Sequence, residues 1–210
     1  MPRPRTPILS RDRIVDAALA LLDETGGFTI PQLAKRLGVS MSSLYHHMTN
    51  RAEIVAGIRE RLTASFPELD PRQPWRQEVR RWARGYREFM VAHPNLVPEL
   101  AANPVVDEWT RRAYEELAAV LERAGLPPAS ILPAITALDS YVLGSAIDVS
   151  VLSDLWATSV ERDGALGRAQ RAVPWSADGI DTAFELGLTG LLLALEELLP
   201  PAADTDGVTG

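Results

Sequence analysis

The sequence predicts an all-α protein, with an N-terminal three-helix helix-turn-helix domain followed by a larger helical domain. Apolar residues recur at spacings of three, four and seven over most of the chain, as on one face of an α-helix. Capping side chains, Gly and Pro stand where these patterns begin and end. With 46% hydrophobic residues, the 210-residue chain can bury a sizeable core, as one large domain or two small ones.

Composition excludes several classes of protein. The chain has no Cys, so a disulfide framework, a zinc thiolate site and a thiol nucleophile are all excluded. The first ten residues have no apolar region of the kind that secretory signals carry. The apolar run at residues 191–195 is short and is followed by Glu196 and Glu197, so it cannot span a bilayer. We therefore expect a cytoplasmic protein without a membrane partner.

The two ends of the chain carry opposite charge. Residues 1–62 hold 9 Lys and Arg against 6 Asp and Glu, a net +3, while residues 63–210 hold 12 against 22, a net −10. A basic end on an acidic body suits a protein that offers DNA only one end. Ordinary scatter of charge is the alternative.

Residues 28–51 predict two short helices joined by a tight turn. Thr29 is placed to cap the first helix, and Pro31 lies in its first turn, where a missing N–H is harmless. Gly38 ends this helix, because glycine adopts the left-handed conformation freely. Ser40 or Ser42 caps the second helix. The apolar stripe of the pair consists of Leu33, Ala34, Leu37, Leu44 and Met48.

The outer face of the second helix has no carboxylate. It carries short hydrogen-bonding groups and one aromatic ring: Met41, Ser42, Ser43, Tyr45 and His46. Such a helix fits a DNA major groove, where a carboxylate would face the phosphates. The alternative is an αα-hairpin of the kind that occurs in any helical protein.

Further helices complete the N-terminal domain. Residues 1–9 predict a flexible basic arm, in which Arg3 and Arg5 either reach the DNA or stay in solvent. Ser10 opens a helix that ends at residues 25–27. Asn50 caps a fourth helix, with Glu53 placed to form a capping box. We therefore assign residues 10–62 to the DNA-binding domain with its connecting helix.

Residues 63–199 form the second predicted domain, which begins at a proline-rich break over residues 66–74. Residues 153–178 predict a loop with a short helix, and 200–210 a flexible tail. The last helix is apolar nearly all round. We therefore expect it to pair with its two-fold mate, together with the helix at 131–152, although a buried central helix is the alternative. Five helices are expected in this domain, over residues 75–92, 95–102, 105–124, 131–152 after a Ser130 cap, and 179–199.

The motif residues of the first domain resemble the tetracycline-repressor (TetR) family of bacterial transcriptional regulators. Met48 and Arg51 stand where the family commonly has Phe and Lys. The resemblance implies a homodimer that binds a double-stranded DNA operator and a small-molecule effector. The matching motif is Phe28-Thr29, Leu33-Ala34, Leu37-Gly38-Val39-Ser40, Leu44-Tyr45-His46-His47 and Asn50-Arg51. It implies DNA contacts by Thr29, Ile30, Pro31, Met41, Ser42, Ser43, Tyr45, His46, His47 and Arg51.

The second domain carries Trp75, Tyr86-Arg87, the stretch from His93 to Asn103-Pro104, Ala124-Gly125-Leu126, and Ala137-Leu138-Asp139 with Tyr141 to Gly144. With these residues it resembles the tetracycline repressor's own C-terminal class, which implies a ligand-binding and dimerisation domain. The residues that hold the drug and its metal there do not carry over: Trp82 replaces an Asn, and Glu99 or Leu100, and Ser140, replace two His. We therefore expect no metal or other cofactor, and a mostly apolar or aromatic effector other than tetracycline. The candidate ligand contacts are Trp82, Tyr86, Met90, His93, Leu100, Trp109, Ser140, Tyr141, Asp148 and Trp156. The aromatic residues among them have core packing as the alternative role.

An enzyme is a poor fit to this sequence. Of its three histidines, His46 and His47 are adjacent and point about 100° apart on a helix, so they cannot chelate one metal. There is no Gly-rich phosphate loop and no nucleophile elbow. The prediction is a ligand-responsive repressor released from a palindromic operator. The alternative is a helical small-molecule-binding or interaction module without a DNA function.

Overall fold

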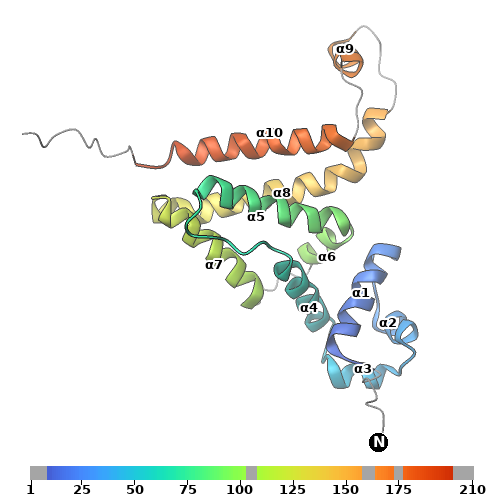
Figure 1. Ribbon diagram of the computed structural model, residues 1–210. Coiled ribbons are helices and arrows are strands. Elements are labelled where there is room, and N and C mark those ends of the chain that lie inside the picture. Colours follow the sequence, from blue (N-terminus) through green and yellow to red (C-terminus); the bar gives the residue numbers. More distant parts are fainter. Residues whose placement is uncertain (1–8, 103–107, 158–163, 173–176, 201–210) are drawn as a thin grey trace, which may run out of the picture.

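The computed structural model describes residues 9–102, 108–157, 164–172 and 177–200, which contain ten helices and no strand (Figure 1). This confirms the all-α prediction. We call α1–α3 together with the first turn of α4 the head, and α5–α10 the body; the rest of α4 joins them. The helices are α1 (Arg11–Thr25), α2 (Ile30–Leu37), α3 (Met41–His47), α4 (Arg51–Ala64), α5 (Trp75–Ala92), α6 (Leu96–Ala102), α7 (Glu108–Arg123), α8 (Pro128–Ala157), α9 (Ala165–Ala172) and α10 (Ala177–Glu196).

The head helices begin and end on the predicted residues. The Ser10, Thr29, Ser40 and Asn50 side chains each accept a hydrogen bond from the backbone N–H three residues later, at the starts of α1 to α4. Ser40, and not Ser42, is therefore the cap of α3. Gly38 ends α2 with a φ of 69°, in the left-handed region that favours glycine. Each terminus is thus fixed by residues close to it in sequence.

Helix α4 packs against both parts of the molecule. It lies on α1 of the head and on α5 and α7 of the body. Ile54 and Ile58 are fully buried in this packing. A Cβ atom on Gly57 would collide with the Val15 side chain, so glycine permits the close approach of α1 to α4. Helix α4 is therefore in direct contact with both the body and α1.

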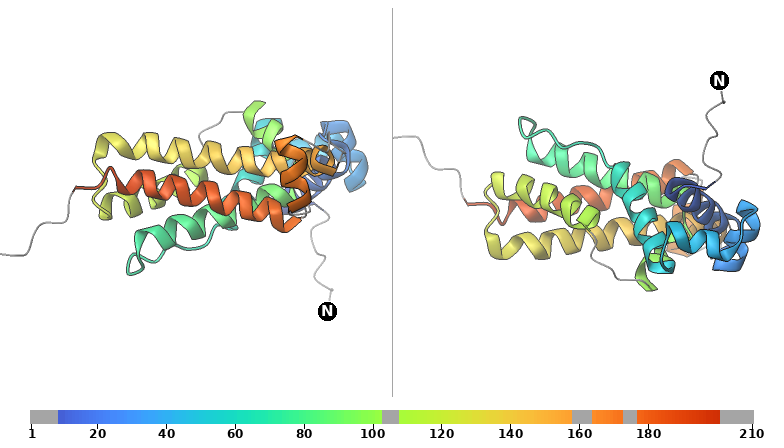
Figure 2. Two further views of the ribbon diagram at one scale, coloured as in Figure 1. Left: turned by 90° about the horizontal axis from the view of Figure 1, so that it is seen from above. Right: turned by 90° about the horizontal axis from the view of Figure 1, so that it is seen from below.

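The body is a bundle in which α8 is central. It packs against α5, α7 and α10, and Figure 2 shows α8 and α10 side by side along much of their length. Trp82, Leu117 and Leu138 are among its fully buried side chains. By length and composition, one described segment, Pro128–Ile147 of α8, could cross a bilayer, but its Leu138 packs in this bundle.

Arginines of α5 bind carboxylates of α10. Arg80 and Arg84 both bind Glu185, at 2.5 and 2.6 Å, and Arg87 binds Asp181 at 2.8 Å. Ion pairs of this kind are screened by salt and hold two surfaces in register more than they stabilise the fold.

The helix bounds in the body differ in places from the prediction. Helix α5 spans the predicted residues 75–92. The Ser130 cap was wrong: α8 begins at Pro128, because proline tolerates the first turn of a helix, and it continues to Ala157. Helix α10 begins at Ala177 and ends at Glu196, two and three residues before the predicted bounds. Residues 1–8 of the predicted arm and 201–210 of the predicted tail lie outside the described residues.

Candidate DNA-binding and effector sites

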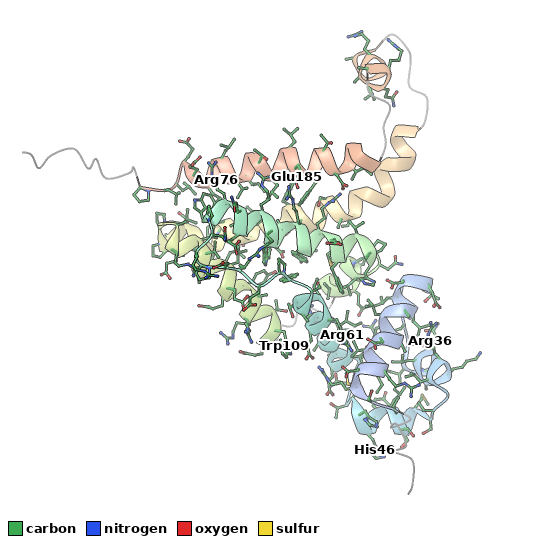
Figure 3. All side chains as sticks on the ribbon, viewed as in Figure 1. Arg36, His46, Arg61, Arg76, Trp109 and Glu185 are labelled. Carbon is green, nitrogen blue, oxygen red and sulfur yellow. The ribbon has the colours of Figure 1, made fainter. Side chains whose placement is uncertain are left out.

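Helix α3 presents most of its predicted outer face to solvent. Met41 and Tyr45 are 50% and 49% exposed, unusually high for large apolar or aromatic side chains. Ser42, His46 and His47 are also exposed, while Ser43 is half-buried. Figure 3 shows His46 at the tip of the head, away from the body. The exposed side chains of α3 are thus a thioether, a hydroxyl, a phenol and two imidazoles.

The neighbouring residues orient α3 and keep its surroundings free of acid. Leu44 and Met48 are buried and fix the inner side of the helix. At the start of α2, Thr29 and Pro31 are exposed and Ile30 is half-buried. Residues 25–52 contain no Asp or Glu. The preceding carboxylate, Glu24, is occupied by Arg36 at 2.6 Å, so the tip of the head offers hydrogen-bond donors and no free anion.

Arg51 lies in the first turn of α4, at the DNA end predicted from sequence. Its guanidinium lies over the Phe28 ring, 4.6 Å from the centroid. Its two terminal nitrogens donate to the two carboxylate oxygens of Glu99, at 2.5 and 2.6 Å. Sequence reasoning missed this partner because 48 residues separate the two positions and no local pattern joins them.

A cavity of about 280 Å³ opens between the end of α4, α5 and α7. Two predicted ligand residues line it, Trp82 and Trp109, and Figure 3 places Trp109 on α7. Trp82 is 1% exposed, yet among the described residues its indole Nε1 has no hydrogen-bond partner. A buried N–H without an acceptor is unfavourable, so this donor is an unsatisfied polar atom of a side chain that lines the cavity. The remaining lining residues are Thr63, Ala64, Phe66, Pro67, Glu68, Arg112, Ala113 and Glu116.

Three aromatic rings join this cavity to the body core. The Phe66 and Tyr86 rings both contact Trp82, at centroid distances of 5.7 and 5.4 Å.

The Tyr114 hydroxyl donates to the Asp139 carboxylate at 2.7 Å. Burial raises the pKa of the Tyr86 and Tyr114 phenols far above their usual range, and the Asp139 charge raises both further. Both hydroxyls therefore remain protonated donors at neutral pH.

Tyr114 and Asp139 were not predicted as site residues. Their positions in the sequence do indicate a partly buried polar group, because each residue adjoins the apolar stripe of its helix: Tyr114 follows Ala113, and Asp139 follows Leu138. The sequence does not show that the two positions face each other across α7 and α8.

The other predicted ligand residues are dispersed. Met90 is fully buried, Ser140 is exposed, and the Tyr141 hydroxyl donates to the Phe184 carbonyl at 2.8 Å. His93 contacts the head and Leu100 contacts α4: His93 Nδ1 is 3.0 Å from the Asp23 carboxylate, and the Leu100 carbonyl accepts from Arg59. The side chains of Asp148 and Trp156 lie outside the described residues.

Two family models together match most of the chain. One, for bacterial regulatory proteins of the tetR family, matches residues 14–58, the helix-turn-helix and its neighbours. The other, for the tetracyclin repressor-like C-terminal domain, matches residues 66–199. The chain therefore belongs to the TetR family of bacterial regulators.

Named relatives support the same assignment. An HTH-type transcriptional regulator of Saccharopolyspora erythraea is 29% identical over 69% of this chain and 63% of its own length. The repressor DrrR1 of Streptomyces coeruleorubidus is 26% identical over 78% of this chain and 60% of its own. The chain thus spans about three fifths of these two relatives. The tetracycline repressor protein class G of Vibrio anguillarum is 27% identical, with 94% and 99% covered.

Solved structures of the family share the fold. The TetR regulator SCO7222 of Streptomyces coelicolor has a TM-score of 0.69 and 28% identity, over 92% of this chain and all of its own. The ActR protein of the same organism, in complex with actinorhodin, has a TM-score of 0.70 and 25% identity, over 90% and 97%.

Proposed function

We propose that this chain is a repressor that binds a palindromic operator as a homodimer and leaves it when an aromatic small molecule occupies the body. The observation that carries this proposal is the exposed, acid-free surface of α3. Such a surface suits a polyanion, because every anionic group there would repel phosphate. The cytoplasm, where bacterial DNA lies, is the place of action. The alternative, a binding module without a DNA function, does not explain this surface.

The head residues divide into two roles in this proposal. Tyr45, His47 and Arg51 bind phosphates, and the start of α2 (Thr29, Ile30 and Pro31) borders the groove. Met41, Ser42, Ser43 and His46 contact base edges. Ser and Met make few bidentate contacts with bases, so DNA shape and bridging water supply part of the specificity.

The exposed apolar side chains of α8 and α10 support a homodimer. Leu132 of α8 is 73% exposed and Leu186 of α10 is 75% exposed, and Leu193 is half exposed. Within the chain, only 28% of the most apolar stretch of Pro128–Ile147 is buried. Two copies related by a two-fold axis would cover both helices as a four-helix contact and would place two α3 helices at successive major grooves.

The cavity at Trp82 supports a flat aromatic effector that carries a hydrogen-bond acceptor. The aromatic side chains of Trp109 and Phe66 line the cavity, and the Trp82 N–H lacks an acceptor among the described residues. Arg112 and Glu116 add charge at the lining. ActR, a protein of this fold, has been solved in complex with the small molecule actinorhodin. By linkage, the operator weakens effector binding by the same factor as the effector weakens operator binding.

The test is selection of genomic fragments of the source organism on the purified protein at two salt concentrations. We expect one palindrome to be enriched at low salt and lost at high salt, because phosphate contacts release counterions. The matched control is Ser42→Glu, which puts a carboxylate on the exposed face of α3 without touching the core. Equal enrichment by this variant, or no palindrome with either protein, would refute the DNA-binding proposal.

A further inference from the structure

The Arg51 guanidinium already has an anionic partner within the chain. Glu99 engages both terminal nitrogens in the parallel geometry in which arginine also binds phosphate. Arg51 is 39% exposed and Glu99 only 10%, so the carboxylate is on the protein side of the pair and the guanidinium is on the solvent side. The charge that the proposed function assigns to a DNA phosphate is neutralised by α6.

Glu99 belongs to a short segment of the body that supplies several polar contacts to the head and to α4. Within residues 93–100, His93 binds Asp23, the Asn95 amide donates to the Leu22 carbonyl at 2.9 Å, and the Leu100 carbonyl accepts from Arg59 at 3.1 Å. The apolar side of the same segment is anchored by the buried Leu96 and Val97. The Arg51–Glu99 pair is the contact of this segment that lies at the N-terminus of α4.

We propose that Glu99 is an internal competitor of operator phosphate for Arg51, and thus an autoinhibitory contact between the body and the DNA-binding head. This inference rests on the proposed function, since it requires Arg51 to face DNA. A phosphate that recruits Arg51 must displace the Glu99 carboxylate, which is only 10% exposed, from both terminal nitrogens of the guanidinium. Because Glu99 belongs to α6, the release of Arg51 depends on where α6 holds this carboxylate.

This competition gives α6 a defined role in the response to the effector. An effector that stabilises α6 in the position seen here strengthens the Arg51–Glu99 pair and weakens operator binding. One that displaces α6 frees Arg51 and strengthens operator binding. Whether the effector weakens or strengthens operator binding therefore depends on the position in which it holds Glu99.

The experiment is a double-mutant cycle on operator affinity, with Glu99→Gln, Arg51→Ala and the double variant. The probe is a duplex that carries the selected palindrome, with a scrambled duplex beside it. We expect Glu99→Gln to bind both duplexes at least about fivefold more tightly than the unaltered protein. In the Arg51→Ala background the same change should have no effect, because no guanidinium remains to be released.

The matched control is Glu60→Gln, which removes a carboxylate of α4 that binds Arg11 of α1. It should change operator affinity less than twofold. Glu99→Asp keeps the charge and should show no gain; a melting curve of each variant verifies folding. Unchanged or weaker binding by Glu99→Gln would overturn the inference, as would an equal gain in the Arg51→Ala background. Absence of salt-dependent operator binding by the unaltered protein would instead overturn the proposed function.

Discussion

The head and the body each leave one helical surface uncovered, and the two surfaces differ in chemistry. On α3 the exposed groups are hydroxyls, imidazoles, a phenol and one thioether, without acid nearby. On α8 and α10 they are leucines such as Leu132 and Leu186. The first surface suits a hydrated polyanion, and the second suits another apolar surface. The surface of α3 is therefore suited to DNA, and the surface of α8 and α10 is suited to a second copy of the chain. Tight operator binding requires both contacts.

The largest effect is expected from breaking the apolar surface. Leu186→Glu together with Leu193→Glu should produce monomers, because two carboxylates would be buried in the two-fold contact. Operator affinity should fall by about a hundredfold or more, since two linked heads bind far more tightly than one. Sedimentation and operator titration measure the two effects. Leu166→Glu on α9, also at an exposed leucine, is the control and should leave both values unchanged.

A smaller loss is expected from the polar surface of the head. Arg51→Ala should weaken binding to every DNA sequence by about tenfold and reduce the salt slope by about one unit, because one phosphate contact is removed. Titrations of the palindrome and of a scrambled duplex at several salt concentrations measure both. Arg61→Ala, at the other end of α4, is the control. An unchanged slope would show that Arg51 does not contact phosphate.

The body offers a third test that should leave DNA binding intact. Trp82→Phe keeps an aromatic ring at this position but removes the unpartnered indole N–H, so effector affinity should fall by about three- to tenfold. Calorimetry with planar aromatic carbonyl compounds, tested first on the unaltered protein, measures this. Equal affinity of both proteins would assign Trp82 to core packing. Loss of operator binding without any effector would lead to the same conclusion.

The smallest expected effect is on stability. Thr29→Ala removes the cap and the capping box of α2, so the free energy of unfolding should fall by about 1 kcal/mol. Urea unfolding followed by circular dichroism measures it. Thr29→Ser keeps the capping hydroxyl and should recover most of the loss; an unchanged stability of Thr29→Ala would refute the role of this cap.

The head was predictable from sequence because its determinants are local. Ser10, Thr29 and Asn50 cap helices within three residues of themselves, and Gly38 ends a helix at its own position. The exposed face of α3 follows from the helical period once Leu44 is placed inside. The assignment to the TetR family follows from the same local motif and is confirmed by the family models.

The body was less predictable because its determinants are long-range. The sequence gives no sign that Arg51 meets Glu99, that His93 meets Asp23, or that Tyr114 meets Asp139. Each pair depends on how helices cross, and periodicity does not specify a crossing. Aromatic residues at helical spacing also look alike whether they line a cavity, as Trp82 does, or lie elsewhere in the core.

The measurement that tests the division of roles most directly is the mass of the complex with the selected operator. Native mass spectrometry of the protein with one palindromic duplex gives the number of chains bound. We predict two chains per duplex, together with a complex of Leu186→Glu/Leu193→Glu that forms only at far higher protein concentration. A single chain bound per duplex with undiminished affinity would contradict the account, because the exposed leucines would then have no part in operator binding.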